Sequence, residues 1–324
     1  MPESPLIGLA AIRGHERARA FLRAAVVHER LPHALLFAGP DGVGKRSLAL
    51  AFVAWVQCEA GGDDACAQCA SCRQLAAGTH PDLQLVCVAP GKKEIGIDRI
   101  RGVKHFMQLQ PMRGKAKVAI VDEAHLLTVA AQNALLKVLE EPPARSFLLL
   151  ISSNPEALLP TVRSRCQRLQ FGPLPVDTVV DIVTGGSDVD PRLARELAVL
   201  AEGSPGRAQV LAACLAGESY EGWRQRVAAL EQARYVRLAQ AANELSAPEG
   251  QLPVKLEMLL SQFRDEAVRD VSAGAFEPAS AAARRLRVLL RRADAVEDAW
   301  NLLRRSNPNR QLLLEALLLR LADS

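Results

Sequence analysis

Glycine, lysine and carboxylate side chains recur in this chain at spacings that suit phosphate chemistry. The segment GPDGVGKRS spans residues 39–47 and fits the pattern G-x-x-x-x-G-K, with Gly39 first, Gly44 sixth and Lys45 last. In such a loop the glycines let backbone amides converge on a phosphate, and the lysine reaches the terminal phosphates. The pattern therefore predicts a phosphate-binding loop that leads into a helix.

The residue after the lysine departs from this pattern. A Ser or Thr hydroxyl at that position binds Mg²⁺, whereas this chain has Arg46, and Ser47 comes one residue too late. One residue turns the direction of a side chain by about 100° around a helix, so Ser47 is expected to point elsewhere. We interpret the loop, with Gly42 at its centre, as one that keeps its shape without turning over nucleotide. These residues leave open whether it binds nucleotide.

A second segment supplies acidic groups. VAIVDEAH, residues 118–125, places Asp122 and Glu123 directly after an apolar run. In phosphate-loop enzymes the first such carboxylate holds Mg²⁺ indirectly and the second orients the attacking water. An ordinary turn is the alternative, but it is disfavoured beside a phosphate loop. The sequence therefore keeps the acidic half of an ATPase site and lacks the hydroxyl half.

Four of the seven cysteines fall in one short segment, as Cys58, Cys66, Cys69 and Cys72. Their spacing, C-x7-C-x2-C-x2-C, suits a closed tetrahedral zinc site, because four thiolates leave no open position for catalysis. An iron–sulfur cluster and unbound thiols are the alternatives. The intervening segment, residues 59–71, has no Lys, Arg or aromatic residue, which disfavours direct reading of nucleic acid by this module.

Four apolar runs of strand length surround these motifs, as expected for strands buried on both faces. They are residues 33–38, 82–88, 117–121 and 146–151. Helical periods lie between them: one helix is predicted over residues 129–141 with Thr128 as its N-cap, and another is predicted to start at Asp98. The alternation predicts an α/β domain in which helices cover a parallel sheet.

The character of the chain changes after residue 171. The segment GPLPVD contains two prolines, and no comparably strong strand-like run follows it. We predict an α/β domain over residues 1–171 with the cysteine module at 58–72, a small helical domain over 172–215 and a longer helical bundle over 216–324.

The charge of the chain is close to balanced. Its 324 residues carry 40 basic and 36 acidic side chains, a net charge of +4, which argues against binding nucleic acid by bulk charge. Arg outnumbers Lys 32 to 8 throughout the chain, so clusters of arginine are interpreted as solvated helix faces. The N-terminus lacks the pattern of a secretory signal and no apolar run is long enough for a membrane span, so we expect a soluble, cytoplasmic protein.

Several motifs in order resemble those of bacterial clamp-loader AAA+ subunits. They are HALLFAGPDGVGK, the cysteine cluster, VAIVDEAH, NALLKVLEEPP and LLPTVRSRCQ, and the resemblance covers residues 5–215. It implies a RecA-like AAA+ domain that bears the zinc module, a helical lid and an all-α collar that joins a five-subunit ring. Arg46 and the C-terminal segment NPNRQLLLEALLLRL are similar to the delta prime branch of this family rather than to the gamma/tau motor.

The resemblance also implies a function and partners. Members of this branch help load the sliding clamp onto primed DNA within the DNA polymerase III holoenzyme, beside gamma/tau and delta subunits and away from any membrane. Arg165, within Ser164-Arg165-Cys166, would act in trans on the ATP of a neighbouring subunit. The resemblance leaves open whether the chain itself binds ATP. Arg207 falls one position beyond the lid arginine of the motor subunits. The alternative is a motor-type or autonomous ATPase that tolerates Arg46.

Overall fold

The computed structural model describes residues 8–186, 189–215, 252–272, 281–305 and 308–322, with Gly222, Gln225 and Ala242. The chain divides into two compact units, Met1–Ile182 with Glu202–Gly206 and Val183–Ala201 with Arg207–Ser324. The predicted domain boundaries at residues 171 and 215 stay predictions, and most of the segment 216–251 lies outside the described residues.

A five-stranded parallel sheet forms the centre of the first unit, in the order β2-β3-β4-β1-β5. Its strands are β1 (Ala34–Ala38), β2 (Leu83–Val86), β3 (Lys117–Val121), β4 (Ser146–Ser152) and β5 (Gln167–Gln170). The first four coincide with the predicted runs, although β4 extends one residue beyond its run, and this confirms the α/β class. The fifth was not predicted, because it is a sheet edge with the polar sequence QRLQ and buries only Leu169.

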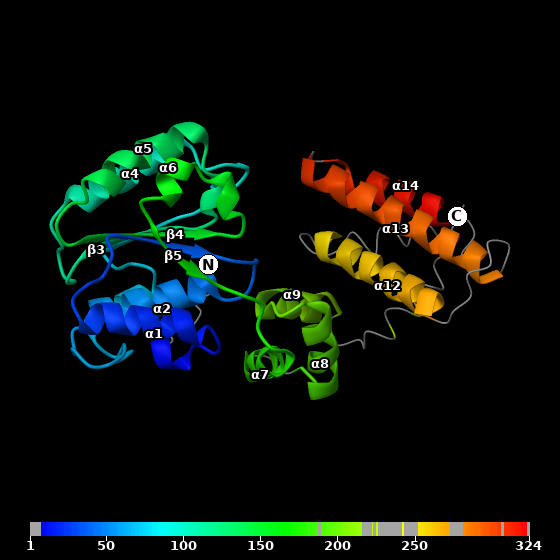
Figure 1. The fold of residues 1–324 in the computed structure, drawn as a ribbon, viewed down its shortest axis with the longest axis horizontal. Coiled ribbons are helices and arrows are strands. Elements are labelled where there is room, and N and C mark those ends of the chain that lie inside the picture. Colours follow the sequence, from blue (N-terminus) through cyan, green and yellow to red (C-terminus); the bar gives the residue numbers. More distant parts are fainter. Residues whose placement is uncertain are drawn as a thin grey trace. The chain divides into compact units, whose positions relative to one another are not determined.

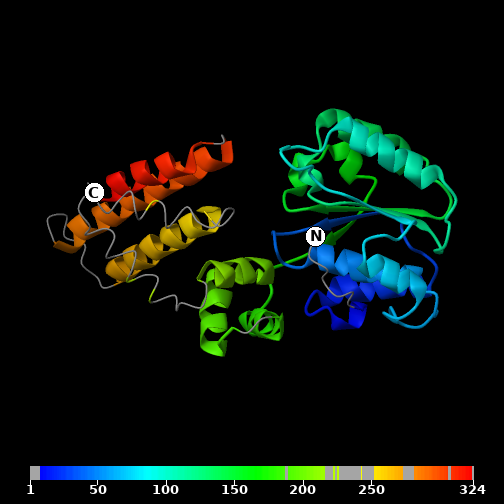
Figure 2. The same ribbon diagram turned by 180° about the vertical axis from the view of Figure 1, so that it is seen from behind.

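Apolar side chains fill both faces of this sheet. Every residue of β1 is buried, and successive side chains alternate between the two faces: Leu35 and Phe37 join one apolar core, and Leu36 joins the other. Figures 1 and 2 show helices covering the sheet on both sides, as strands buried on both faces require.

The helices of this unit divide between the two faces. The helices α1 (Glu16–Val27) and α2 (Lys45–Gln57) supply one core, and α4 (Ile97–Gln108) and α5 (Val129–Glu140) supply the other. Short elements complete the unit: η1 (Leu9–Ala11), α3 (Ala70–Ala76), η2 (Ala124–Leu126), η3 (Pro155–Ala157) and α6 (Pro160–Arg163).

Of the two predicted helix starts, the one at Thr128 is confirmed and the one at Asp98 is wrong. The hydroxyl of Thr128 accepts a hydrogen bond from the N–H of Ala131 at 3.2 Å, so Thr128 is the N-cap of α5 as predicted. The prediction that α4 starts at Asp98 was wrong. Its N-cap is Gly96, and Asp98 lies inside the first turn, where its carboxylate pairs with Arg101 at 3.1 Å.

The regular secondary structure of the second unit, over its described residues, is helical as predicted. Four helices belong wholly to this unit: α8 (Pro191–Leu200), α12 (Leu252–Ser272), α13 (Ala281–Arg305) and α14 (Arg310–Ala322). Two more helices, α7 (Val176–Gly186) and α9 (Pro205–Leu215), begin in the first unit and end in the second. The helix α13 packs against both α12 and α14. In the described part of the chain, no helix combines the length and the apolar character that a membrane span needs.

One buried ion pair anchors the sheet edge. The Lys117 ammonium lies 2.9 Å from the Asp82 carboxylate, and both side chains are almost fully buried. The same carboxylate accepts hydrogen bonds from the N–H groups of Met112, Arg113 and Gly114 at 2.8, 2.7 and 2.6 Å. Burial by itself would raise the pKa of Asp82, but these N–H donors and Lys117 outweigh burial and lower the pKa below its usual range.

We predict that Asp82→Asn lowers the free energy of unfolding by about 3–5 kcal/mol, because it leaves the Lys117 charge buried without its partner. A carboxylate with a lowered pKa stabilises the fold above its unfolded pKa of about 3.9 and loses that effect as the pH falls below it, so the deficit is present in full at pH 7. Urea unfolding measures it. Asp98→Asn, which removes an exposed pair, is the control and should cost less than about 1 kcal/mol; equal losses in the two variants would contradict the role of the buried pair.

Candidate nucleotide site and cysteine cluster

The predicted phosphate loop lies where it must to bind an anion, between the carboxyl end of β1 and the start of α2. Gly44 caps this helix with φ at 103°, a conformation that side chains other than glycine rarely adopt. A Cβ atom at Gly39 would collide with the backbone carbonyl of Phe171. The glycines therefore permit both the turn and the close approach of the chain after β5.

Lys45 is folded back onto its own loop. Its side chain is buried, and its ammonium donates to the carbonyl oxygens of Gly39 at 2.6 Å and Pro40 at 2.5 Å. Burial lowers the pKa of Lys45, and the charges of Asp41 and Asp122 oppose that effect. A bound phosphate would compete with the two carbonyls for this ammonium.

The next three loop carbonyls are also occupied by protein donors. The Asp41 carbonyl accepts from the Ser204 hydroxyl at 2.9 Å, and the Gly42 carbonyl accepts from the Gly206 N–H at 2.9 Å. The Val43 carbonyl lies 2.7 Å from Nε2 of His15, which donates in the tautomer protonated there.

The loop amides are arranged differently from the carbonyls. Within the described residues, the amides of residues 41, 42 and 44–46 make no hydrogen bond, whereas the turn at Asp41–Gly42 uses the Val43 amide. The loop thus directs its carbonyls toward protein donors, while most of its amides have no acceptor in the described part of the chain.

Asp122, at the end of β3, is held by protein donors on both oxygens. Its Oδ1 accepts from the N–H of Glu123 at 3.0 Å, and its Oδ2 lies 3.1 Å from Nη1 of Arg46. The Asp122 side chain is only 14% exposed, whereas that of Arg46 is 36% exposed. Ser47 is exposed, in agreement with the prediction that it points away, and so is Glu123.

This ion pair changes the chemistry that the site can perform. In a metal-dependent site the carboxylate at this strand end faces the cation, and a hydroxyl after the lysine completes its coordination. In this chain Arg46 stands at the position of that hydroxyl, and its guanidinium faces the Asp122 carboxylate instead. Sequence reasoning noticed the missing hydroxyl but not this pair, because nothing in the spacing shows that residues 46 and 122 meet.

Arg165 lies on the surface just after α6. Its guanidinium donates to the Thr161 carbonyl at 2.9 Å and lies 2.9 Å from the Glu140 carboxylate at the end of α5. The side chain is 37% exposed. Arg207 also has an acidic neighbour, because its Nη2 lies 3.3 Å from Glu257 of α12 within the second unit.

The turn before Arg207 contributes to the site in a way that sequence reasoning missed. The segment SPGR was predicted only as a turn, but Ser204 and Gly206 bind the phosphate loop as described above. A Cβ atom at Gly206 would lie 3.0 Å from Cα of Gly42, so a side chain at this position would crowd the phosphate loop. The glycine itself is the signal that predicts such a close approach.

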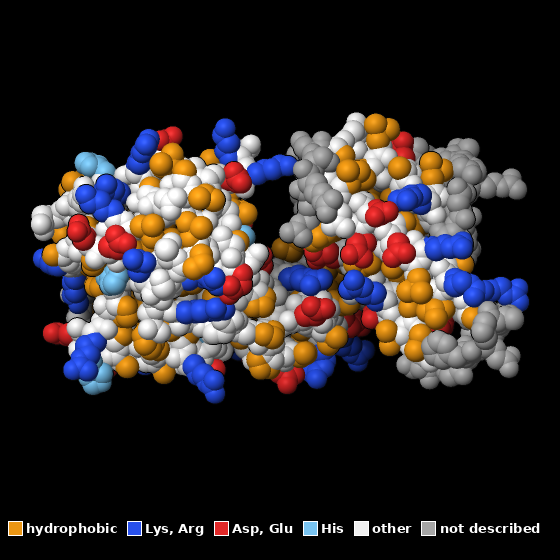
Figure 3. All heavy atoms as spheres, turned by 45° about the horizontal axis from the view of Figure 1, so that its top comes forward, with side chains coloured by type: hydrophobic (Ala, Val, Ile, Leu, Met, Phe, Trp, Pro, Cys, Tyr) orange, Lys and Arg blue, Asp and Glu red, His pale blue; other side chains and the backbone are white. Residues whose placement is uncertain are grey.

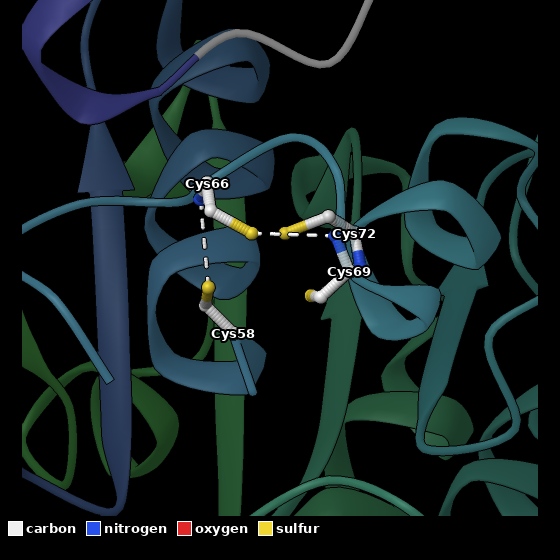
Figure 4. Close-up of side chains that lie close together, drawn as sticks. All are labelled: Cys58, Cys66, Cys69 and Cys72. Atoms are coloured by element: carbon white, nitrogen blue, oxygen red, sulfur yellow. Dashed lines mark hydrogen bonds between the residues drawn. The ribbon is translucent and has the colours of Figure 1, made fainter. Parts of the chain in front are cut away.

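The four clustered cysteines come together as predicted. Their sulfur atoms all lie within 4.8 Å of one another, and Figure 4 shows the side chains directed toward a common centre. A tetrahedral ion with metal–sulfur bonds of about 2.3 Å needs sulfur atoms about 3.8 Å apart, so the donor set fits such an ion after small movements. Cys58 ends α2, while Cys69 caps α3 and Cys72 lies in its first turn.

Backbone N–H groups point at these sulfur atoms. The N–H of Cys66 lies 3.4 Å from Sγ of Cys58, the N–H of Cys69 lies 3.3 Å from Sγ of Cys66, and the N–H of Cys72 lies 3.4 Å from Sγ of Cys69. Hydrogen bonds from Gln68 and Cys69 lower the pKa of Cys66 to about 6, whereas burial raises the pKa of Cys72. A metal ion would supply the positive charge that the buried Cys72 thiolate lacks.

The cysteine module forms hydrogen bonds to two other parts of its unit. The Asp64 carboxylate accepts from the N–H groups of Leu9 and Ala10 at 2.7 and 2.8 Å. On α3, the Ser71 hydroxyl lies 2.9 Å from Nε2 of His80, whose Nδ1 accepts from the N–H of Asp82 at 3.1 Å. The module therefore braces the N-terminal segment and the edge strand β2.

Comparison with known proteins places this chain among replication proteins. The family model described as "DNA polymerase III, delta subunit" matches residues 14–175, which is half of the chain. The chain is 40% identical over 182 residues to DNA polymerase III subunit delta' of Pseudomonas aeruginosa, a match that covers 55% of each chain. It is 37% identical over 180 residues to the delta' subunit of Escherichia coli, covering 55% of this chain and 54% of that one.

Other similar proteins are named as tau or gamma-related subunits. The tau subunit of Bacillus subtilis is 38% identical over 159 residues, which are 49% of this chain and 28% of tau. A solved structure of a DNA polymerase III gamma subunit-related protein from Thermotoga maritima shares 19% identity and a TM-score of 0.48, covering 93% of this chain and 98% of that one. The matches span about half the length of the delta' relatives. With its family model and its delta' relatives, the chain belongs to the DNA polymerase III delta subunit family, as a member of the delta prime type.

Proposed function

We propose that this chain is a clamp-loader subunit of the DNA polymerase III holoenzyme that does not itself hydrolyse ATP and supplies Arg165 to a neighbouring subunit. The observation that carries the proposal is the ion pair between Arg46 and Asp122. The pair engages the carboxylate that would hold Mg²⁺, and Arg46 stands at the position where a Ser or Thr hydroxyl would bind the metal. Without that metal, charge developing on a transferred phosphoryl group is not neutralised.

A motor-type ATPase is the second candidate. The retained Lys45 and the amides of residues 41, 42 and 44–46, which make no hydrogen bond within the described residues, favour it, because both are parts of a working phosphate loop. The exposed Glu123 and the engaged Asp122 oppose it, since neither carboxylate is arranged around a cation. We therefore prefer the non-hydrolysing subunit.

The surface position of Arg165 suits action in trans. Its partner Glu140 is 49% exposed, and exposed ion pairs contribute only about 0–1 kcal/mol, so little free energy opposes exchange of Glu140 for a phosphate. A guanidinium inserted from a neighbouring subunit stabilises charge in phosphoryl transfer. The α/β domain would thus complete the neighbour's site rather than its own.

The remaining surface supports contacts with other proteins. Acidic and basic side chains are interspersed with apolar ones on the described part of the face in Figure 3, in keeping with the net charge of +4. The helices α12, α13 and α14 expose Val268, Leu290 and Leu312. We propose that these helices form the collar that joins gamma/tau and delta subunits in a five-subunit ring, and that the chain reaches the sliding clamp and primed DNA in the cytoplasm through that complex.

We further propose that the cysteine cluster holds a structural zinc ion. Cys58, Cys66, Cys69 and Cys72 would supply all four ligands, so the ion would have no open position for a substrate. Its role would be to fix the module against the N-terminal segment and β2.

We predict that Arg165→Ala lowers turnover at the ATP site beside it by about 10³-fold or more, since trans-acting arginines contribute on that scale. The measurement is DNA-stimulated ATP hydrolysis by the clamp-loader complex reconstituted with the variant chain. Arg168→Ala is the matched control, because Arg168 is an exposed arginine on β5 whose partner is Glu156. Unchanged hydrolysis with Arg165→Ala would refute the trans role.

Metal analysis of the purified chain should find one zinc ion per chain. Cys69→Ser should lose the zinc and lower the thermal stability, because metal binding and local folding are coupled. Cys214→Ser, which changes a cysteine of α9 outside the cluster, should keep both. Iron in place of zinc, or no metal, would show that the cluster has another role.

A further inference from the structure

We propose that the phosphate loop binds a nucleoside polyphosphate without a divalent cation, and that Arg46 acts as the fixed cation of the site. This inference goes beyond the proposed function, and it is independent of Arg165. The contacts of Arg46 carry the argument.

Arg46 excludes the metal by both charge and geometry. Mg²⁺ demands about six oxygen ligands in near-octahedral geometry at 2.0–2.1 Å. At this site one Asp122 oxygen accepts from a backbone N–H at 3.0 Å and the other from Nη1 of Arg46 at 3.1 Å, and no hydroxyl follows Lys45. A metal ion would have to displace a positively charged group from the carboxylate that it needs.

Arg46 also has donors left for a ligand. A guanidinium has five N–H donors in a planar fork that matches phosphate oxygens, and the pair with Asp122 occupies only Nη1. Its Nε and Nη2 have no partner among the described residues, and 36% of the side chain is exposed. The same group can therefore hold Asp122 on one side and a phosphate oxygen on the other.

The loop next to Arg46 is already shaped for the phosphates. Its five successive carbonyls, at residues 39–43, accept hydrogen bonds from protein donors, so they are held away from an incoming anion. The amides of residues 41, 42 and 44–46 make no hydrogen bond within the described residues and lie at the start of the 13-residue helix α2. Binding requires only that the buried Lys45 ammonium exchange two carbonyls for phosphate oxygens.

This arrangement holds a ligand without reacting with it. A guanidinium carries one positive charge where Mg²⁺ would bring two, so the site neutralises a diphosphate more completely than a triphosphate. Glu123 is exposed rather than directed at a cation, so nothing orients an attacking water. We expect ADP to bind at least as tightly as ATP.

The test is equilibrium binding of a fluorescent ADP to the full chain, in EDTA and in excess Mg²⁺. For the wild-type chain we expect the two Kd values to agree within about twofold. Arg46→Thr restores the hydroxyl and frees Asp122, so its binding should become at least about tenfold tighter in Mg²⁺ than in EDTA. Arg46→Lys keeps a cation and should bind without Mg²⁺, while Arg101→Thr, an exposed arginine of α4, is the control that should match the wild type.

Two results would overturn the inference: wild-type binding that requires Mg²⁺, or no binding in either condition. If the affinity of Arg46→Thr for ADP does not depend on Mg²⁺, Arg46 is not the residue that makes binding independent of the metal. If Arg46→Thr does not fold, ADP binding by the wild-type chain and by Arg46→Lys still tests the inference. If this inference is wrong, the expected effect of Arg165→Ala on the reconstituted complex is unchanged. The two proposals can therefore be refuted independently.

Discussion

One ion pair joins the two halves of the candidate nucleotide site. Arg46 comes from the start of α2 and Asp122 from the end of β3, and their 3.1 Å contact stands where phosphate-loop enzymes hold a metal ion. The fold brings these elements together through the parallel sheet, since the ends of its strands meet at one edge. The pair places a guanidinium against the carboxylate that would hold the cation in an ATPase site of this architecture.

The phosphate loop is also held in place without a ligand. Donors from His15, Ser204 and Gly206 join Lys45 in occupying its carbonyls, so two other segments of the first unit hold the loop. A loop held in this way does not depend on nucleotide for its shape. This agrees with a subunit that serves as a rigid partner for its neighbours.

The sequence predicted those parts of the fold that depend on local pattern. Four strands could be recognised because burial on both faces makes them continuous apolar runs, and the cysteine cluster because its spacing reflects tetrahedral geometry. The edge strand β5 was missed because one exposed side lets it be polar. Asp98 was assigned as a cap because its type suits one, yet the helix begins at a glycine before it.

Contacts between distant residues could not be predicted in this way. No spacing reveals that Arg46 meets Asp122, or that Ser204 meets the phosphate loop 163 residues earlier. The most direct test of the central claim is therefore ATP hydrolysis by the isolated chain in Mg²⁺. The account predicts no turnover above the uncatalysed rate, and turnover that Lys45→Ala abolishes would contradict it.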